Sequence, residues 1–120
     1  MMIRSITTAA SVVALLGVFA SPVAFSAAHG DMIAAGKAVA FDRKLGNCLT
    51  CHNIPGGTAP GNIGPPLIAM KARFPDKNVL RAQIWDATMS NPGSMMPPFG
   101  KHNVLTEEQI DQVTEFVHSL

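Results

Sequence analysis

The sequence predicts a single small all-α domain with long Pro/Gly-rich loops, and three observations favour that fold class. A chain of 120 residues is enough for one domain. Apolar residues near the C-terminus recur at helical spacing, and no stretch has the alternation typical of a strand. Residues 54–66 hold four prolines and four glycines, so no regular element can run through them.

The charge balance excludes two classes of protein. Nine Lys and Arg side chains against eight Asp and Glu give a net charge of +1 with histidines neutral. Neither a nucleic-acid-binding protein nor a polybasic membrane-surface protein is expected from so even a balance.

Residues 1–28 have the pattern of a cleaved secretory signal peptide. Arg4 precedes an apolar stretch at residues 9–20, and small residues lead to Ala28. Cleavage after Ser26 is a close alternative, and an uncleaved anchor is disfavoured because the apolar stretch is short of the ~20 residues that span a bilayer. We therefore expect an exported, periplasmic bacterial protein with one domain at 29–120 and no membrane attachment after cleavage.

The first helix is expected over residues 31–44, with Gly46 as its stop. Gly36 and Phe41 would let this helix cross closely against the last helix of the chain near Phe116. That role concerns packing rather than chemistry.

The motif Cys48-Leu49-Thr50-Cys51-His52 follows directly and is the C-x-x-C-H signature of covalent haem attachment. Two thiols three positions apart can reach the two vinyl groups of one porphyrin, and this anchoring holds the His52 imidazole over the iron. The motif predicts one covalent haem c, with Cys48 and Cys51 as its attachment points and His52 as an iron ligand.

Three other uses of the two cysteines are less well supported by the sequence. A thioredoxin-like pair would need a βαβ pattern, which the sequence lacks. A zinc site with His102 or His118 lacks a second pair of ligands at the usual spacing. A simple disulfide between Cys48 and Cys51 remains conceivable, although the export signal gives independent support to haem.

The segment Gly64-Pro65-Pro66 is expected to support the histidine ligand. A haem-ligating histidine usually donates its second ring N–H to a carbonyl, which fixes its tautomer and raises its basicity. The Pro65 carbonyl is the candidate acceptor, and Gly64 allows close approach. The alternative is an ordinary turn entering a helix at Pro66.

Two short helices are expected next. The first covers residues 66–74 and ends at Pro75, and the second starts at the Asp76 cap and continues through Ala87. Trp85 is expected mainly as a core residue, with contact to the haem as the alternative.

Met96 is the expected sixth ligand of the iron. Pro97 and Pro98 fix φ after it and favour a stiff, extended loop that can present a thioether. Met95 is the rival, but adjacent side chains of an extended segment point in opposite directions, so one of the two should face iron. The plainer alternative is that both methionines fill an apolar pocket.

The last helix is the clearest element in the sequence. Thr106 and Gln109 form a capping-box start, and an apolar stripe at helical spacing follows over residues 110–120.

These elements together predict a small class I cytochrome c fold, with helices wrapped around one haem. An iron with both axial positions filled is saturated, so it should pass single electrons rather than bind a substrate. No catalytic Ser/His/Asp set, phosphate-binding loop or carboxylate pair is visible, and no catalytic residue is assigned.

Several longer phrases resemble the SoxX family, the class I cytochrome subunits of periplasmic SoxAX complexes in sulfur-oxidising bacteria. They include Phe41-Asp42-Arg43-Lys44, Gly61-Asn62-Ile63-Gly64-Pro65-Pro66-Leu67, Arg81-Ala82-Gln83-Ile84-Trp85-Asp86-Ala87-Thr88 and Met96-Pro97-Pro98-Phe99-Gly100. The resemblance covers nearly all of the expected mature chain.

The resemblance implies a heterodimer with a SoxA cytochrome, in a complex with L-cysteine S-thiosulfotransferase activity. That complex joins thiosulfate oxidatively to a cysteine of the carrier SoxY, and the catalytic haem is expected on SoxA. The SoxX haem would relay electrons towards another periplasmic cytochrome, with Cys48, Cys51, His52 and Met96 in their family roles. The alternative function is a free-standing diffusible periplasmic cytochrome c.

Overall fold

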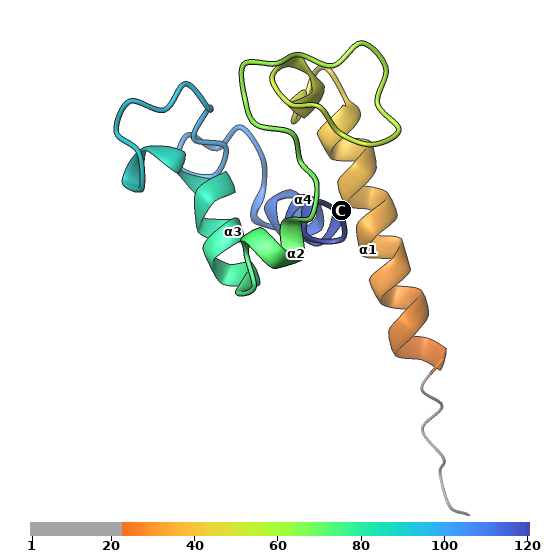
Figure 1. Ribbon diagram of the computed structural model, residues 1–120. Coiled ribbons are helices and arrows are strands. Elements are labelled where there is room, and N and C mark those ends of the chain that lie inside the picture. Colours follow the sequence, from red (N-terminus) through yellow and green to blue (C-terminus); the bar gives the residue numbers. More distant parts are fainter. Residues whose placement is uncertain (1–22) are drawn as a thin grey trace, which may run out of the picture.

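The computed structural model describes residues 23–120, and every regular element in that range is a helix (Figure 1). Most of the expected signal peptide at 1–28 lies outside the described residues. Within 23–120 there is no strand, which confirms the all-α fold class. None of the described helices is both long enough and apolar enough to cross a bilayer.

The longest helix, α1 (Val23–Phe41), packs against the C-terminal helix, α4 (Glu107–His118). The two helices approach closely at Gly36, where a Cβ atom would lie 1.9 Å from the backbone oxygen of Gln112. One turn further along α1, the Phe41 and Phe116 rings meet edge to face, with centroids 5.9 Å apart. The close crossing expected from the sequence is confirmed.

Helix α4 begins with the expected capping box. The Thr106 hydroxyl accepts a hydrogen bond from the Gln109 backbone N–H at 3.2 Å, and the Gln109 side-chain oxygen accepts from the Thr106 N–H at 3.0 Å. These bonds satisfy two backbone donors that a helix start otherwise leaves without partners. The apolar stripe of α4 is buried and forms the centre of the core; its members are Ile110, Val113, Phe116 and Val117.

Helix α3 (Lys77–Trp85) packs on α4 from another side, and Figure 1 shows α4 between α1 and α3. As expected, Asp76 caps α3 by accepting from the Asn78 backbone N–H at 2.9 Å. At the surface, the Arg81 guanidinium bonds to Asp111 of α4 at 2.6 Å.

The bounds of α1 and of the helix that follows the Pro/Gly-rich loop differ from those expected. Helix α1 stops at Phe41 rather than Lys44, because the Asp42 carboxylate accepts from the Lys44 N–H at 2.7 Å and starts a turn. The expected helix over 66–74 shortens to α2 (Met70–Arg73). The reason is that Leu67 N–H donates to the Asn53 carbonyl at 2.9 Å and Ala69 takes a left-handed conformation with φ of 51°.

The helix expected to run through Ala87 ends at Trp85. Asp86 is extended there, and its carboxylate caps a separate 3₁₀ turn, η2 (Ala87–Met89), by accepting from the Thr88 N–H at 3.1 Å. A second 3₁₀ turn, η1 (Cys48–Thr50), lies in the C-x-x-C-H motif. The long loops that carry the motif and the methionines lie in the upper part of Figure 1, beyond the helical core.

Candidate functional site

One apolar cavity of about 670 Å³ lies between α3, α4 and the long loops. This volume falls within the usual range for a cofactor pocket. The predicted site residues all line it, namely Cys48, Cys51, His52, Pro65, Met95 and Met96. The core contributes much of the remaining wall, including Leu67, Met70, Leu80, Ile84, Phe99, Leu105, Val113 and Val117.

The tight turn of η1 brings both thiols and the imidazole to one wall of this cavity. Asn47 enters the turn in a left-handed conformation with φ of 48°, and the His52 N–H donates to the Cys48 carbonyl at 2.9 Å. Cys48 and Cys51 are free thiols, so the structure holds no disulfide between them.

The two thiols differ in environment. Burial raises the pKa of the Cys48 thiol to about 11, and the neighbouring Cys51 adds to this effect, while a backbone hydrogen bond opposes it. At neutral pH Cys48 is therefore a protonated, apolar-facing thiol, which is a poor redox nucleophile.

The His52 ring is fixed from two sides. Its Nδ1 atom lies 2.7 Å from the Pro65 carbonyl oxygen. A carbonyl can only accept, so Nδ1 carries the proton and the lone pair is left on Nε2. The Gly64 backbone lies against the ring, where a Cβ atom would come within 2.4 Å of Cε1.

The loop that carries Gly64 and Pro65 is attached to the motif by backbone bonds. The Gly61 N–H donates to the Leu49 carbonyl at 2.7 Å, and the Gly64 N–H donates to the Cys51 carbonyl at 2.8 Å. Gly61 also permits this approach, because a Cβ there would lie 1.9 Å from the Thr50 oxygen. The Pro65 carbonyl is thus held in register with the histidine it contacts.

The two methionines line the same cavity but differ in exposure. Met95 is 80% exposed, whereas Met96 is half-buried and packs against the core cluster. The Met96 N–H donates to the Ser94 hydroxyl at 3.2 Å, which fixes the backbone at that position. The difference in burial favours Met96 as the thioether that faces the interior.

Two of the alternatives weighed from the sequence find no support. Within residues 23–120 no group of three His, Cys, Asp or Glu side chains could hold a metal ion, and His118 bonds to the Phe74 carbonyl instead. Trp85 does not line the cavity; it packs against the core, with Gly100 on its indole face.

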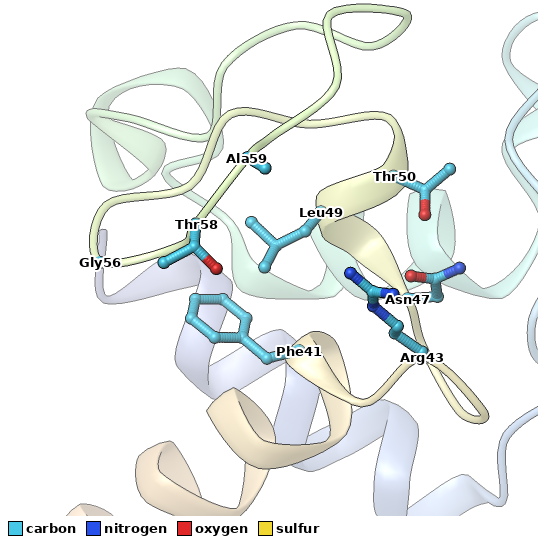
Figure 2. A pocket seen from close by; sticks show the side chains of 8 residues that line it. All are labelled: Phe41, Arg43, Asn47, Leu49, Thr50, Gly56, Thr58 and Ala59. Carbon is cyan, nitrogen blue, oxygen red and sulfur yellow. The ribbon is translucent and has the colours of Figure 1, made fainter.

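A second hollow of about 560 Å³ lies on the outer side of the motif turn (Figure 2). Leu49 points into it, and Arg43, Asn47 and Thr58 give it a more polar wall. It shares Arg43, Asn47 and Thr50 with the larger cavity and so adjoins it, but it contains no thiol, imidazole or thioether.

The donor set of the larger cavity fits a covalent haem. Two thiols, a histidine with its Nε2 lone pair available and an inward thioether line a cavity whose remaining wall is mostly apolar. Polar or charged ligands for a hard cation are not gathered there, and soft thioether and imidazole donors suit haem iron.

Two side chains near the site were not singled out from the sequence. Arg73 lines the cavity and donates to the Pro66 carbonyl at 2.8 Å. Asp86 is buried and pairs with Lys101, at 2.8 Å, across the base of the methionine loop. The Asp-Ala-Thr turn at residues 86–88 was a local signal for the role of Asp86 as a cap. Its contact with Lys101 depends on the tertiary fold and has no local signal.

Comparison with known proteins places the chain beside other cytochromes. The family described as cytochrome c oxidase, cbb3-type, subunit III matches residues 31–117. An uncharacterized lipoprotein of Aquifex aeolicus (strain VF5) is 36% identical over 76 residues, covering 62% of this chain and 37% of that protein. The cbb3-type cytochrome c oxidase subunit CcoP of Azospirillum sp. (strain B510) is 35% identical over 81 residues, covering 62% of this chain and 27% of the subunit. The chain thus spans well under half the length of these two relatives.

Proposed function

Because the chain belongs to the cytochrome c family of cbb3-type oxidase subunit III, we propose that it is a monohaem electron carrier. In this proposal Cys48 and Cys51 attach the haem, and His52 and Met96 are its axial ligands. The observation that carries it is the convergence of these four side chains on one apolar cavity.

Each of these residues has a defined task. Cys48 and Cys51 would attach the haem as thioethers, and the Pro65 carbonyl keeps the His52 Nε2 lone pair available by accepting a hydrogen bond from Nδ1–H. The Met96 sulfur would hold the iron as the second protein ligand, and the apolar wall would exclude water. When bound, haem supplies a one-electron Fe(III)/Fe(II) couple, and methionine ligation in a dry pocket favours the reduced state.

Paired methionine variants test the ligand set. We expect Met96→Ala to abolish the weak long-wavelength charge-transfer band of methionine sulfur on ferric iron, and to open the iron to added cyanide. Met95→Ala is the matched control, since its side chain is 80% exposed, and it should keep the band. Loss of the band in Met95→Ala alone would reverse the assignment.

We further propose that the carrier is the SoxX-type subunit of a periplasmic SoxAX complex, paired with a SoxA-like cytochrome. The support is the set of extended phrases around residues 41–67 and 81–100, which go beyond the C-x-x-C-H signature. The family match is to cbb3-type oxidase subunit III and contains nothing specific to SoxX. The charge balance is also compatible with a permanent complex. Loss of Arg4 with the signal peptide leaves equal numbers of basic and acidic side chains, so there is no net charge to speed the encounter of a diffusing carrier with its partners.

The chemistry of the proposed complex sets the task of this subunit. Joining thiosulfate to a cysteine thiol of SoxY forms one S–S bond and releases two electrons and one proton. A carrier with one haem takes one electron at a time, so it must be reoxidised between the two transfers by another periplasmic cytochrome. Bond formation is assigned to the SoxA subunit and not to this chain.

Co-purification from the native organism tests the partner. We expect the protein to elute with a larger cytochrome subunit, and its deletion to reduce thiosulfate-dependent modification of SoxY. Recovery as a free monomer, with SoxY modification unchanged after deletion, would favour a diffusible carrier. In that case we propose a cbb3-type cytochrome c oxidase as the electron acceptor, because the Azospirillum relative is named as a subunit of such an oxidase.

A further inference from the structure

The segment that carries Met96 is a loop closed at its base. It leaves helix α3 after Trp85 and returns to the same point, where the Gly100 and Lys101 N–H groups donate to the Trp85 carbonyl at 3.1 and 3.3 Å. At that base the Lys101 ammonium lies 2.8 Å from the Asp86 carboxylate. The loop from residue 86 to residue 101 is therefore joined end to end by an ion pair and two backbone bonds.

Asp86 is an unusual partner for a surface lysine because it is only 3% exposed. One of its oxygens accepts from the N–H and the hydroxyl of Thr88, and the other faces Lys101. The Lys101 and Thr88 bonds hold the pKa of Asp86 below its usual value. A buried carboxylate that lost the lysine would have to take up water or a proton, which favours opening of the base.

The fit at the base is close, whereas the middle of the loop is held by local hydrogen bonds and exposes large apolar side chains. A Cβ atom at Gly100 would lie 2.0 Å from the Trp85 indole, so the returning chain lies directly on that ring. Between the two ends, Met89 and Met95 are each 80% exposed. Joining the two ends of the loop lowers the conformational entropy that the loop loses when Met96 is placed in the cavity. The bonds at the base therefore help to set the position of Met96.

We propose that the Asp86–Lys101 ion pair is a latch that positions Met96 in the cavity and so determines how well the methionine competes with other iron ligands. The latch rests on the proposed function, because it acts through Met96 as a ligand. Asp86 and Lys101 are positioning residues, and neither lines the cavity.

Imidazole binding to the ferric holoprotein measures that competition, because imidazole must displace the methionine. We expect Lys101→Gln to bind imidazole about tenfold more tightly than wild type, in the range of typical coupling between sites. Lys101→Arg keeps the charge and should restore nearly normal affinity. Lys44→Gln, at an exposed lysine in the turn after α1, is the matched control and should stay within about twofold of wild type.

A purely structural role for the pair would lower the unfolding midpoint of Lys101→Gln and leave the imidazole affinity unchanged, which would overturn the latch. Thr88→Val provides a second variant should Lys101→Gln fail to fold, and a smaller rise in affinity is expected because Lys101 still pairs with Asp86. No change in that variant would also count against the latch. The wild-type spectrum separates the two proposals: absence of the methionine band overturns the ligand set and the latch together, whereas an intact band with unresponsive variants overturns the latch alone.

Discussion

The two sides of the molecule are held together by different means. On the helical side, α1, α3 and α4 pack directly on one another, through the Gly36 crossing, the aromatic pair of Phe41 and Phe116, and the buried stripe of α4. On the loop side, residues 42–69 and 86–105 contain only short helical turns and surround the cavity. Hydrogen bonds and glycine contacts order these loops, together with a few buried anchors, namely Ile54, Leu67, Phe99 and Leu105.

This difference separates stability from chemistry. The helical side resembles any small helical core, where apolar burial dominates. The loop side presents its apolar residues to a cavity of about 670 Å³, so its packing and its function depend on the same bound group. Changes at the α1–α4 crossing, which lies outside the cavity wall, should therefore alter unfolding with little effect on the haem spectrum, and changes on the loop side should do the reverse.

Removal of both thiols, which lie on the loop side, is expected to have the largest effect. Cys48→Ala with Cys51→Ala should yield no covalently bound haem, because no thioether can form. Acid–acetone extraction followed by haem staining of a denaturing gel measures this, with wild type retaining its stain. Retention of stain in the double variant would contradict the attachment sites.

A side chain added at the α1–α4 crossing should be the most damaging change on the helical side. In Gly36→Ala the new methyl would lie 1.9 Å from the Gln112 oxygen, so α1 and α4 must separate. We expect a loss of about 3 kcal/mol in the free energy of unfolding, measured with denaturant, and an unchanged haem spectrum in the folded protein.

Gly30→Ala on the same helix is the matched control, since a Cβ there meets nothing within 4 Å. It should not destabilise the protein. A change in the haem spectrum of folded Gly36→Ala would show that packing at the helix crossing and the haem site are not independent.

Gly64→Ala tests the loop side at the histidine. The added methyl would lie 2.4 Å from Cε1 of His52 and should displace the ring from the Pro65 carbonyl. We expect the reduction potential to rise, because a less basic imidazole stabilises ferric iron less. The loss of stability should be smaller than at Gly36, about 1–2 kcal/mol.

Gly93→Ala is the control for Gly64, because its nearest neighbour would be the Asn91 side chain at 3.7 Å. It should leave the potential measured by redox titration unchanged. Equal shifts in both variants would mean that the potential responds to loop strain in general and not to the histidine contact.

The sequence predicted the two sides unequally well. Helix α4 and the Asp76 cap follow from local patterns, because caps and apolar spacing act within one or two turns. The C-x-x-C-H turn and the two methionines were likewise identified as local motifs, and the fold brings them to one cavity. The early end of α1 depended on an Asp42 side-chain bond that competes with the helix, which apolar periodicity does not report.

The partners of those motifs were harder to predict. The Asp86–Lys101 pair and the Arg73 contact join residues through the folded loops, and an isolated lysine or arginine carries no local signal of its partner. The Gly64 contact with the histidine was anticipated because the haem motif supplied a reason for a nearby carbonyl acceptor. The general lesson is that the loop side becomes predictable only where a ligand requirement constrains it.

The smallest expected effect is at the start of α4, where the helical side can be weakened without touching any packing. Thr106→Ala removes the hydroxyl that accepts from the Gln109 N–H, while Thr106→Ser keeps that acceptor. Loss of an N-cap costs about 1 kcal/mol, so the alanine variant should unfold at lower denaturant concentration and the serine variant should match wild type. Both should keep the methionine band and normal imidazole affinity, because the cap lies outside the cavity wall. A weakened band in Thr106→Ala would mean that α4 transmits its stability to the methionine loop, and that the two sides unfold as one unit.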